Sequence, residues 1–179
     1  MTTTADVGEL TGDYVLDTAR TRIGFAARAA MVTKVRGQFD EFEGSAHLDG
    51  DAPSMSTARL TIRARSVRTR NRKRDDHLRG NDFLGTDGHP AITFTSTRVE
   101  QAEETGFKVT GDLTVRGVTK PVVVDVRLTG AEKDRQGTFR VAFTGRATVH
   151  RKDWGVSGGG GLISDKVALE FDIAAIRRS

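Results

Sequence analysis

The chain has 179 residues, a formal net charge of +4, 36% hydrophobic and 29% charged residues, and no cysteine. This length suits one domain, and the composition allows an ordered core beneath a well-solvated surface. The lack of cysteine excludes disulfides, thiolate metal sites and cysteine nucleophiles, and so modest a net charge does not by itself predict nucleic-acid binding.

The first dozen residues have neither the basic region nor the apolar stretch of a secretory signal. No run in the chain reaches the roughly 18 to 20 apolar residues of a membrane-spanning helix. We therefore expect a flexible N-terminal tail over residues 1–12, a single barrel domain over residues 13–179, and a cytoplasmic protein.

After this tail, apolar and polar residues alternate with a period of two, which predicts β-strands. In chain order the predicted strands are YVLD (14–17), RIGFAAR (22–28), VRGQFDEFEGSAHLD (35–49), ARLTIRARSV (58–67), ITFTST (92–97), FKVTGDLTVRG (107–117), and the alternating runs 122–128, 139–149 and 167–173. Short turns separate them, as expected for antiparallel neighbours. Eight such strands can close into an all-β barrel, whose interior holds packed side chains or one small ligand. Alternation leaves open whether the barrel is filled or hollow.

One short helix is predicted within NRKRDDHLRGNDF, with Asn71 as N-cap and Gly80 as its stop. A second short turn is predicted at Ala29–Val35. Consecutive helix residues point about 100° apart, so Asp75, Asp76 and His77 cannot converge on one metal ion. We interpret the helix as a cap over one barrel end, with Leu78 pointing inward and Asp75 and Asp76 paired with neighbouring arginines, and we predict no metal site.

Nine cationic side chains fall between Arg59 and Arg79. Such a run is typical of phosphate binding, but it lacks nearby aromatic residues for base stacking. A solvated or membrane-facing basic surface is the preferred interpretation, and a nucleic-acid-binding barrel stays open as an alternative.

The glycine-rich segment VSGGGGLISDK (156–166) leads into a strand, not into the helix that a phosphate-binding loop requires, and it is interpreted as a turn at the barrel rim. Asp153, which could form a rim ion pair with Arg151, and Trp154, which is expected to close the barrel, precede it. No G-x-S-x-G motif occurs, and the four histidines lack ligand spacing, so no catalytic residue is predicted. A small-molecule enzyme acting at the barrel mouth stays open.

The ordered segments YVLD (14–17), IGFAARAAMVTKVRGQF (23–39), SVRTRNRKRDDHL (66–78), NDFLGTDGHPAITFTST (81–97), VTGDLTVRGVTKPV (109–122), RKDWG (151–155) and SDKVALEFDI (164–173) resemble the YceI-like polyisoprenoid-binding proteins. The resemblance implies a lipocalin-like barrel that carries or stores a long-chain isoprenoid or quinone-like lipid without catalysis. One departure is Ala29, where many members have a histidine, so a head-group role for that histidine does not carry over.

Alternation places apolar residues on one face of each strand, and the resemblance implies that this face meets the ligand. The expected ligand-lining residues are Phe25, Val35, Phe39, Leu60, Ile62, Leu78, Phe83, Phe94, Leu113, Val124, Phe143, Leu169 and Phe171. The expected head-group or rim residues are Arg74, His77, Asp153 and Trp154. Apart from the bound lipid no cofactor is expected. Transient contact with an anionic membrane is the expected partnership, and a homodimer stays open.

Overall fold

The computed structural model describes residues 7–30 and 33–178, in which eleven strands form one antiparallel sheet. The strands are β1 (Gly12–Leu16), β2 (Arg22–Ala29), β3 (Thr33–Phe39), β4 (Phe42–Leu48), β5 (Thr57–Arg63), β6 (Val67–Arg68), β7 (Ala91–Gln101), β8 (Gly106–Val115), β9 (Val118–Lys133), β10 (Phe139–His150) and β11 (Lys166–Arg177). The helical segments within these ranges are α1 (Arg72–Arg79) and the 3-10 turns η1 (Val7–Leu10), η2 (Thr18–Arg20), η3 (Pro53–Met55), η4 (Ala64–Ser66), η5 (Arg151–Trp154) and η6 (Gly160–Leu162).

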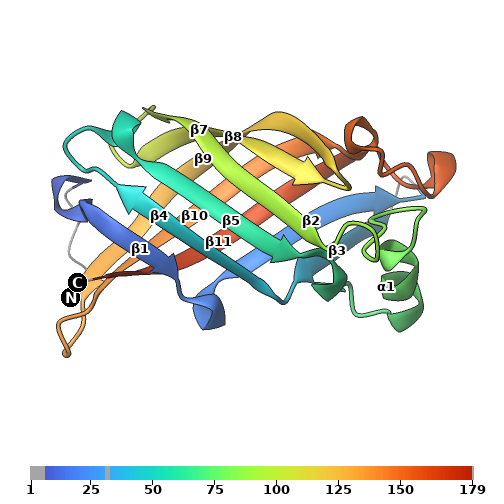
Figure 1. Ribbon diagram of the computed structural model, residues 1–179, viewed down its shortest axis with the longest axis horizontal. Helices are drawn as coiled ribbons and strands as arrows, with labels where there is room; N and C mark the ends of the chain where they lie inside the picture. Colours follow the sequence, from blue (N-terminus) through green and yellow to red (C-terminus); the bar gives the residue numbers. More distant parts are fainter. Residues whose placement is uncertain (1–6, 31–32, 179) are drawn as a thin grey trace.

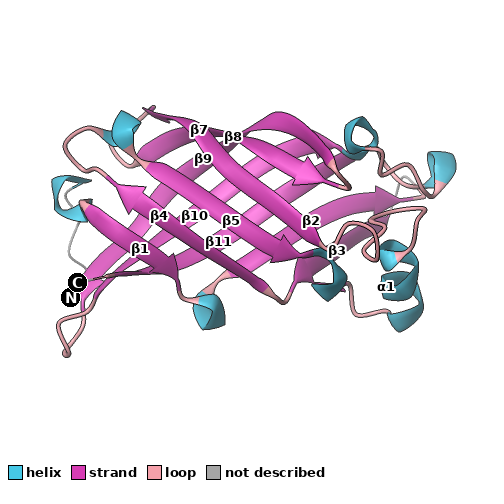
Figure 2. Cartoon of the chain, in the orientation of Figure 1, coloured by secondary structure: helices cyan, strands magenta, loops and turns pink. Residues whose placement is uncertain are grey.

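The sheet closes into an elongated barrel because β1 pairs with β4 on one edge and with β11 on the other (Figure 1). The ring runs β1-β4-β5-β7-β8-β9-β10-β11, and these eight antiparallel strands confirm the predicted all-β barrel. Closure pairs the backbone groups that an open sheet would leave exposed along its edges. Strands form the wall in Figure 2, and α1 lies at one end.

The remaining strands, β2, β3 and β6, prolong members of this ring at the end where α1 lies. Turn η2 separates β1 from β2, yet both pair with β11, β1 along 175–177 and β2 along 168–172. Further along, β3 pairs with β2 and β6 pairs with β3. Three of the eight strands are therefore bent and interrupted, which lengthens the barrel wall towards α1.

The end of the barrel opposite α1 is closed by the segment around η1. Leu10 is buried, and the Tyr14 hydroxyl donates a hydrogen bond of 2.8 Å to its carbonyl oxygen. Burial raises the pKa of Tyr14, an effect that Arg177 partly offsets. The segment expected to be a tail, residues 1–12, thus includes a turn that packs against the barrel.

The predicted helix is present as α1, with Asn71 as its N-cap. The Asn71 side chain accepts a hydrogen bond of 3.0 Å from the Arg74 amide, and Gly80 follows the last turn. The predicted turn at Ala29–Val35 is a hairpin connection, since β2 extends to Ala29 and β3 begins at Thr33. Ala30 adopts a left-handed φ of 51°, and Met31 and Val32 lie outside the described residues.

Part of the basic run is neutralised by carboxylates on the outer surface. Ion pairs join Arg63 to Glu41, Arg68 to Asp40 and Arg79 to Asp76. The hydrogen bond from Arg68 lowers the pKa of Asp40 below its usual range, while partial burial opposes this.

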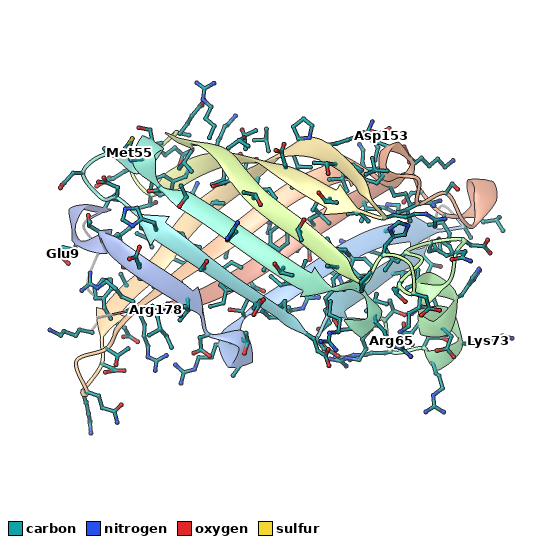
Figure 3. The ribbon with its side chains drawn as sticks, viewed as in Figure 1. Glu9, Met55, Arg65, Lys73, Asp153 and Arg178 are labelled. Carbon is teal, nitrogen blue, oxygen red and sulfur yellow. The ribbon has the colours of Figure 1, made fainter. Side chains whose placement is uncertain are left out.

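Four exposed cations of this run that lie near α1, which we call the basic patch, make no ion pair with any described residue. They are Arg65, Arg70, Arg72 and Lys73. Figure 3 shows Arg65 and Lys73 at the end with α1, opposite Glu9 and Met55. Over the described part of the chain, no helix combines the length and apolar character needed to cross a bilayer.

Candidate functional site: two apolar cavities in the barrel

Two apolar cavities follow one another along the barrel interior. The helix-end cavity, of about 300 Å³, lies at the α1 end and is lined by α1 and by residues of β2, β3 and β11. The far-end cavity, of about 230 Å³, lies towards η1 and η3. Leu60 and Phe171 line both cavities, so these two residues mark the boundary between them. Volumes of this size are those of small-molecule sites.

Each residue predicted to line the ligand lies on the wall of one or both cavities. The helix-end cavity has Phe25, Val35, Phe39, Ile62, Leu78, Phe83, Leu113 and Leu169, while the far-end cavity has Phe94, Val124 and Phe143, and Leu60 and Phe171 belong to both. The structure brings the predicted residues together along one interior, and their contact with a ligand stays a prediction.

Aromatic rings in this wall lie against glycines on neighbouring strands. Phe25 is the register partner of Gly37, and a Cβ atom added to Gly37 would overlap the Phe25 ring. The Phe94 ring covers Gly111 in the same way. Since the glycines lack side chains, the rings occupy that space beside the wall, which helps to leave volume along the axis.

Helix α1 is fastened to the barrel end by buried and half-buried polar contacts. The Asp75 carboxylate accepts hydrogen bonds from the Thr69 amide, at 2.8 Å, and from the Thr69 hydroxyl, at 2.5 Å. Arg79 donates to the carbonyl oxygens of Arg65 and Val67. The prediction that Asp75 pairs with a neighbouring arginine is therefore wrong, because Thr69 takes up its carboxylate.

Two arginines hold the loops that complete this end. Arg116 donates through Nη1 to the carbonyl oxygens of Asn81 and Phe83. The amide of Gly158 bonds to the carbonyl oxygen of Asp82 at 2.7 Å, which joins the loop after α1 to the glycine-rich loop. Phe83 is thereby held in the cavity wall, and it is 4% exposed.

Arg151 occupies the interior of the glycine-rich loop. Its guanidinium donates to the carbonyl oxygens of Val156, Gly158, Ile163 and Ser164, at 2.7 to 3.0 Å. Burial lowers the pKa of this guanidinium, and the charge of Asp165 partly opposes that effect. The ion pair considered between Arg151 and Asp153 does not form, because Arg151 is turned towards these carbonyl oxygens.

The predicted rim residues separate into two groups. Arg74, His77 and Trp154 line the helix-end cavity, and the Trp154 indole donates a hydrogen bond of 2.9 Å to the Leu113 carbonyl oxygen. Asp153 is exposed on η5 and is not among the lining residues (Figure 3). Trp154 therefore closes the wall, as expected, and Asp153 lies outside it.

Among the described residues, no three histidine, aspartate or glutamate side chains are grouped to hold a metal ion. His77 lies 3.2 Å from Asp82 and His150 lies 3.2 Å from Asp165, and these ring nitrogens and carboxylates are exposed to solvent.

Two features of the site were missed from the sequence. Leu10 and Tyr14 line the far-end cavity, although Leu10 lies in the expected tail. Arg151 was assigned to the rim, although the inward positions Ala147 and Val149 place it on the same face by alternation. A charged residue in an inward position was the available signal.

Comparison with known proteins agrees with this architecture. The family model described as the YceI-like domain matches residues 14–175. A UPF0312 protein of Shewanella sp. (strain W3-18-1) is 34% identical over 168 residues, which covers 93% of this chain and 88% of the relative.

Solved structures share the fold at lower identity. Burkholderia cenocepacia BcnA superposes with a TM-score of 0.81 at 22% identity, covering 89% of this chain and 98% of that one. A polyisoprenoid binding domain from Saccharophagus degradans superposes with a TM-score of 0.70 at 17% identity, covering 92% of this chain and 98% of the other.

Proposed function

This chain belongs to the YceI-like family, and from that premise we propose that its barrel binds and carries or stores a long-chain apolar lipid of the isoprenoid or quinone type, without catalysis. The observation that carries the proposal is the pair of adjoining apolar cavities along the barrel axis. The description of the Saccharophagus degradans domain as polyisoprenoid binding supports this ligand class. We propose that the predicted wall residues contact the lipid and that Phe171 and Leu60 contact the middle of its alkyl chain.

The energetics of burial favour reversible binding of the lipid over very tight binding. Each buried methylene contributes about 0.8 kcal/mol relative to water. A lipid that leaves a bilayer gains almost none of this, since it exchanges one apolar environment for another. Selection must then come from the length of the cavities and from polar groups at their ends.

We also propose that the basic patch docks the barrel transiently on an anionic membrane. Arg72 and Lys73 lie on α1, Arg70 comes two residues before it, and Arg65 lies at the same end of the barrel (Figure 3). Each cation held near an anionic surface contributes about 1 kcal/mol. Changing all four to glutamine should abolish sedimentation with anionic vesicles at low salt. Sedimentation that ignores both salt and anionic lipid content would contradict docking. Fractionation of cells would test the expected cytoplasmic location.

Native mass spectrometry, followed by organic extraction of the purified protein, tests the central proposal. We expect the protein to carry an extra mass that dissociates on activation and is recovered in the extract as an apolar chain. After prolonged incubation of the protein with this lipid, the mass of the lipid should be unchanged. The same spectra distinguish a monomer from a homodimer. Protein that carries no lipid and fails to take up an added prenyl lipid would contradict the carrier role, and a chemically altered lipid would contradict its non-catalytic character.

A further inference from the structure

Arginine and histidine side chains supply most of the polar lining of the helix-end cavity. Arg28, Arg74, His77 and Arg151 line it together with Thr69, and no aspartate or glutamate occurs among its described lining residues. The Trp154 indole is already bonded to a backbone carbonyl oxygen. This end of the interior is therefore rich in hydrogen-bond donors and has no carboxylate.

Arg151 is a buried charge that forms no ion pair with a described residue, although the charge of Asp165 acts on it. It is 7% exposed, and no described carboxylate lies within ion-pair distance of it. Its guanidinium lies 5.9 Å from the centre of the Phe83 ring, on the cavity wall. Four of its five N–H groups bond to backbone carbonyl oxygens, and one on Nη2 has no partner among the described residues.

Arg74 and His77 line the same cavity as Arg151. Arg74 directs Nε and Nη2 to Thr69, at 2.8 Å each, and its Nη1 has no bond to a described residue. Asp75 forms no direct ion pair with Arg74, because the Thr69 hydroxyl lies between them, donating to the Asp75 carboxylate at 2.5 Å and accepting from Arg74 Nε at 2.8 Å. The His77 ring packs edge-on against Phe83, whose ring also lies near Arg151.

The far-end cavity is lined by one cation, Arg59, and one carboxylate, Asp49. Its lining includes the carboxylate residue Asp49, which accepts hydrogen bonds from the amides of Asp51 and Ala52. The Tyr14 hydroxyl there is committed to the Leu10 carbonyl oxygen. An anionic group would meet one arginine and one carboxylate among the described residues that line this end, against three arginines and no carboxylate among those that line the other, whereas an alkyl tail would find an apolar wall.

We infer that the barrel selects amphiphiles with an oxyanion head, a carboxylate or a phosphate monoester, held by Arg74 and Arg151 while the chain runs past Phe171 towards the far end. This inference rests on the proposed function and names the ligand class and its direction. Guanidinium groups match oxyanions by paired, charge-assisted hydrogen bonds. Burial makes such a charge costly when alone, which increases the advantage of an anionic ligand over a neutral one. The desolvation that lowers the pKa of Arg151 is consistent with this.

Three amphiphiles with the same chain provide the test: hexadecanoic acid, hexadecyl phosphate and 1-hexadecanol, below their aggregation limits. Trp154, the single tryptophan of the chain, lines the cavity and reports binding by its fluorescence. We expect the acid and the phosphate to bind at least about tenfold more tightly than the alcohol, as for one added charge-assisted bond. Tighter binding of the phosphate than of the acid would identify a phosphorylated head, and equal binding would identify charge alone as the selected property.

Variants separate recognition from loop anchoring. Arg74→Gln and Arg151→Gln should each weaken binding of the acid about tenfold and leave binding of the alcohol unchanged. Arg151→Lys should retain part of the preference because it keeps the charge. Arg146→Gln, which removes an exposed cation of β10 that lines neither cavity, is the matched control and should change nothing.

Two results would overturn the inference. One is equal affinity of the wild-type protein for the acid and the alcohol, which would favour a neutral head. The other is an equal loss for acid and alcohol in a folded Arg74→Gln protein, which would leave that arginine a purely structural role. If Arg151→Gln does not fold, the Arg74→Gln comparison still decides. Failure of all three probes to bind would instead count against the proposed function itself.

Discussion

Glycine and phenylalanine lie against each other on neighbouring strands at several places in the barrel wall. Phe25 covers Gly37, Phe94 covers Gly111, and a Cβ on Gly145 would lie 3.1 Å from Phe171. An added methyl group must displace such a ring, and the open direction is the cavity. At the residue scale, the free volume thus depends on glycine at positions where any other residue would place a Cβ atom.

Replacing Gly37 with alanine should push the Phe25 ring into the helix-end cavity. We expect the free energy of unfolding in urea to fall by about 1–3 kcal/mol, the usual cost of overpacking, together with reduced uptake of a prenyl lipid. Gly161→Ala is the control, since nothing lies within 4 Å of a Cβ placed there. Unchanged stability and uptake in Gly37→Ala would show that the ring moves freely without using the cavity.

Asp165 links acid stability to the loop that contains Arg151. A hydrogen bond from the Lys152 amide, helped by His150, lowers the pKa of Asp165 in the folded protein despite an opposing desolvation effect. Because its pKa is lowered in the folded state, ionised Asp165 stabilises the protein above the unfolded-state pKa of about 3.9. This stabilisation is lost as the pH falls through the folded-state pKa. Asp165→Asn should therefore melt at a lower temperature at pH 7 and lose less on acidification below about pH 4.

The exposed Asp153, two residues beyond the first residue of η5, provides the comparison for this change. Asp153→Asn should leave the melting temperature unchanged at both pH values, because no bond or ion pair to a described residue is recorded for its side chain. If the melting temperatures of the wild type and Asp165→Asn change in parallel with pH, Asp165 does not make the proposed contribution to stability.

At the scale of elements, the α1 end is a lid assembled from short segments. Arginine side chains bonded to backbone carbonyl oxygens hold these segments: Arg79 binds the η4–β6 segment, Arg116 the loop after α1 and Arg151 the glycine-rich loop. Helix α1 itself has eight residues, too few to be stable without its cap and its packing. Entry and exit of a ligand are therefore expected to depend on this end of the barrel.

Removing the N-cap of α1 should loosen the lid. Asn71→Ala deletes the acceptor for the Arg74 amide, at a cost of about 1 kcal/mol. If opening of α1 limits ligand release, release should accelerate by up to about fivefold, measured by stopped-flow transfer of lipid to vesicles. Asn71→Asp keeps an acceptor and should release at the wild-type rate. Faster exchange of α1 amides without faster release would place the exit elsewhere.

For the whole molecule, the arrangement of the two cavities defines how long a ligand can be. The cavities adjoin at Leu60 on β5 and Phe171 on β11, two strands that are not neighbours in the ring. The walls on either side are apolar, while the ends differ, with three arginines near α1 and one arginine, Arg59, with a turn carboxylate, Asp49, at the other end. A chain that passes Phe171 uses both volumes, and a shorter chain uses one.

Phe171→Ala should widen the boundary and join the two volumes. We expect the preferred chain length in a series of prenyl alcohols to increase, while stability falls by no more than about 3–5 kcal/mol. Phe42→Ala removes a ring packed beside Ile62 that lines neither cavity, so it serves as the control for stability alone. Identical chain-length profiles for the two variants would mean that Phe171 does not separate the cavities.

Much of the wall was predictable because alternation is local. The sequence indicated that Val122, Val124, Val126 and Leu128 share a face, and the structure buries three of them and half-buries Val126. The cap of α1 was likewise predictable from Asn71 and its neighbours. The contact of Asp75 with Thr69 was not, because a helical pattern predicts near neighbours and not the loop that folds back beside the helix.

Period-two alternation by itself determined the class of fold and which side chains face inward, since each strand must turn its apolar face away from water. Only the tertiary structure decided that the interior is hollow and that Arg151 meets backbone carbonyl oxygens at one end of it. The reason is physical. Free volume and the surroundings of a buried charge depend on residues brought opposite one another by ring closure, such as Phe25 with Gly37, and no single strand contains both members of such a pair.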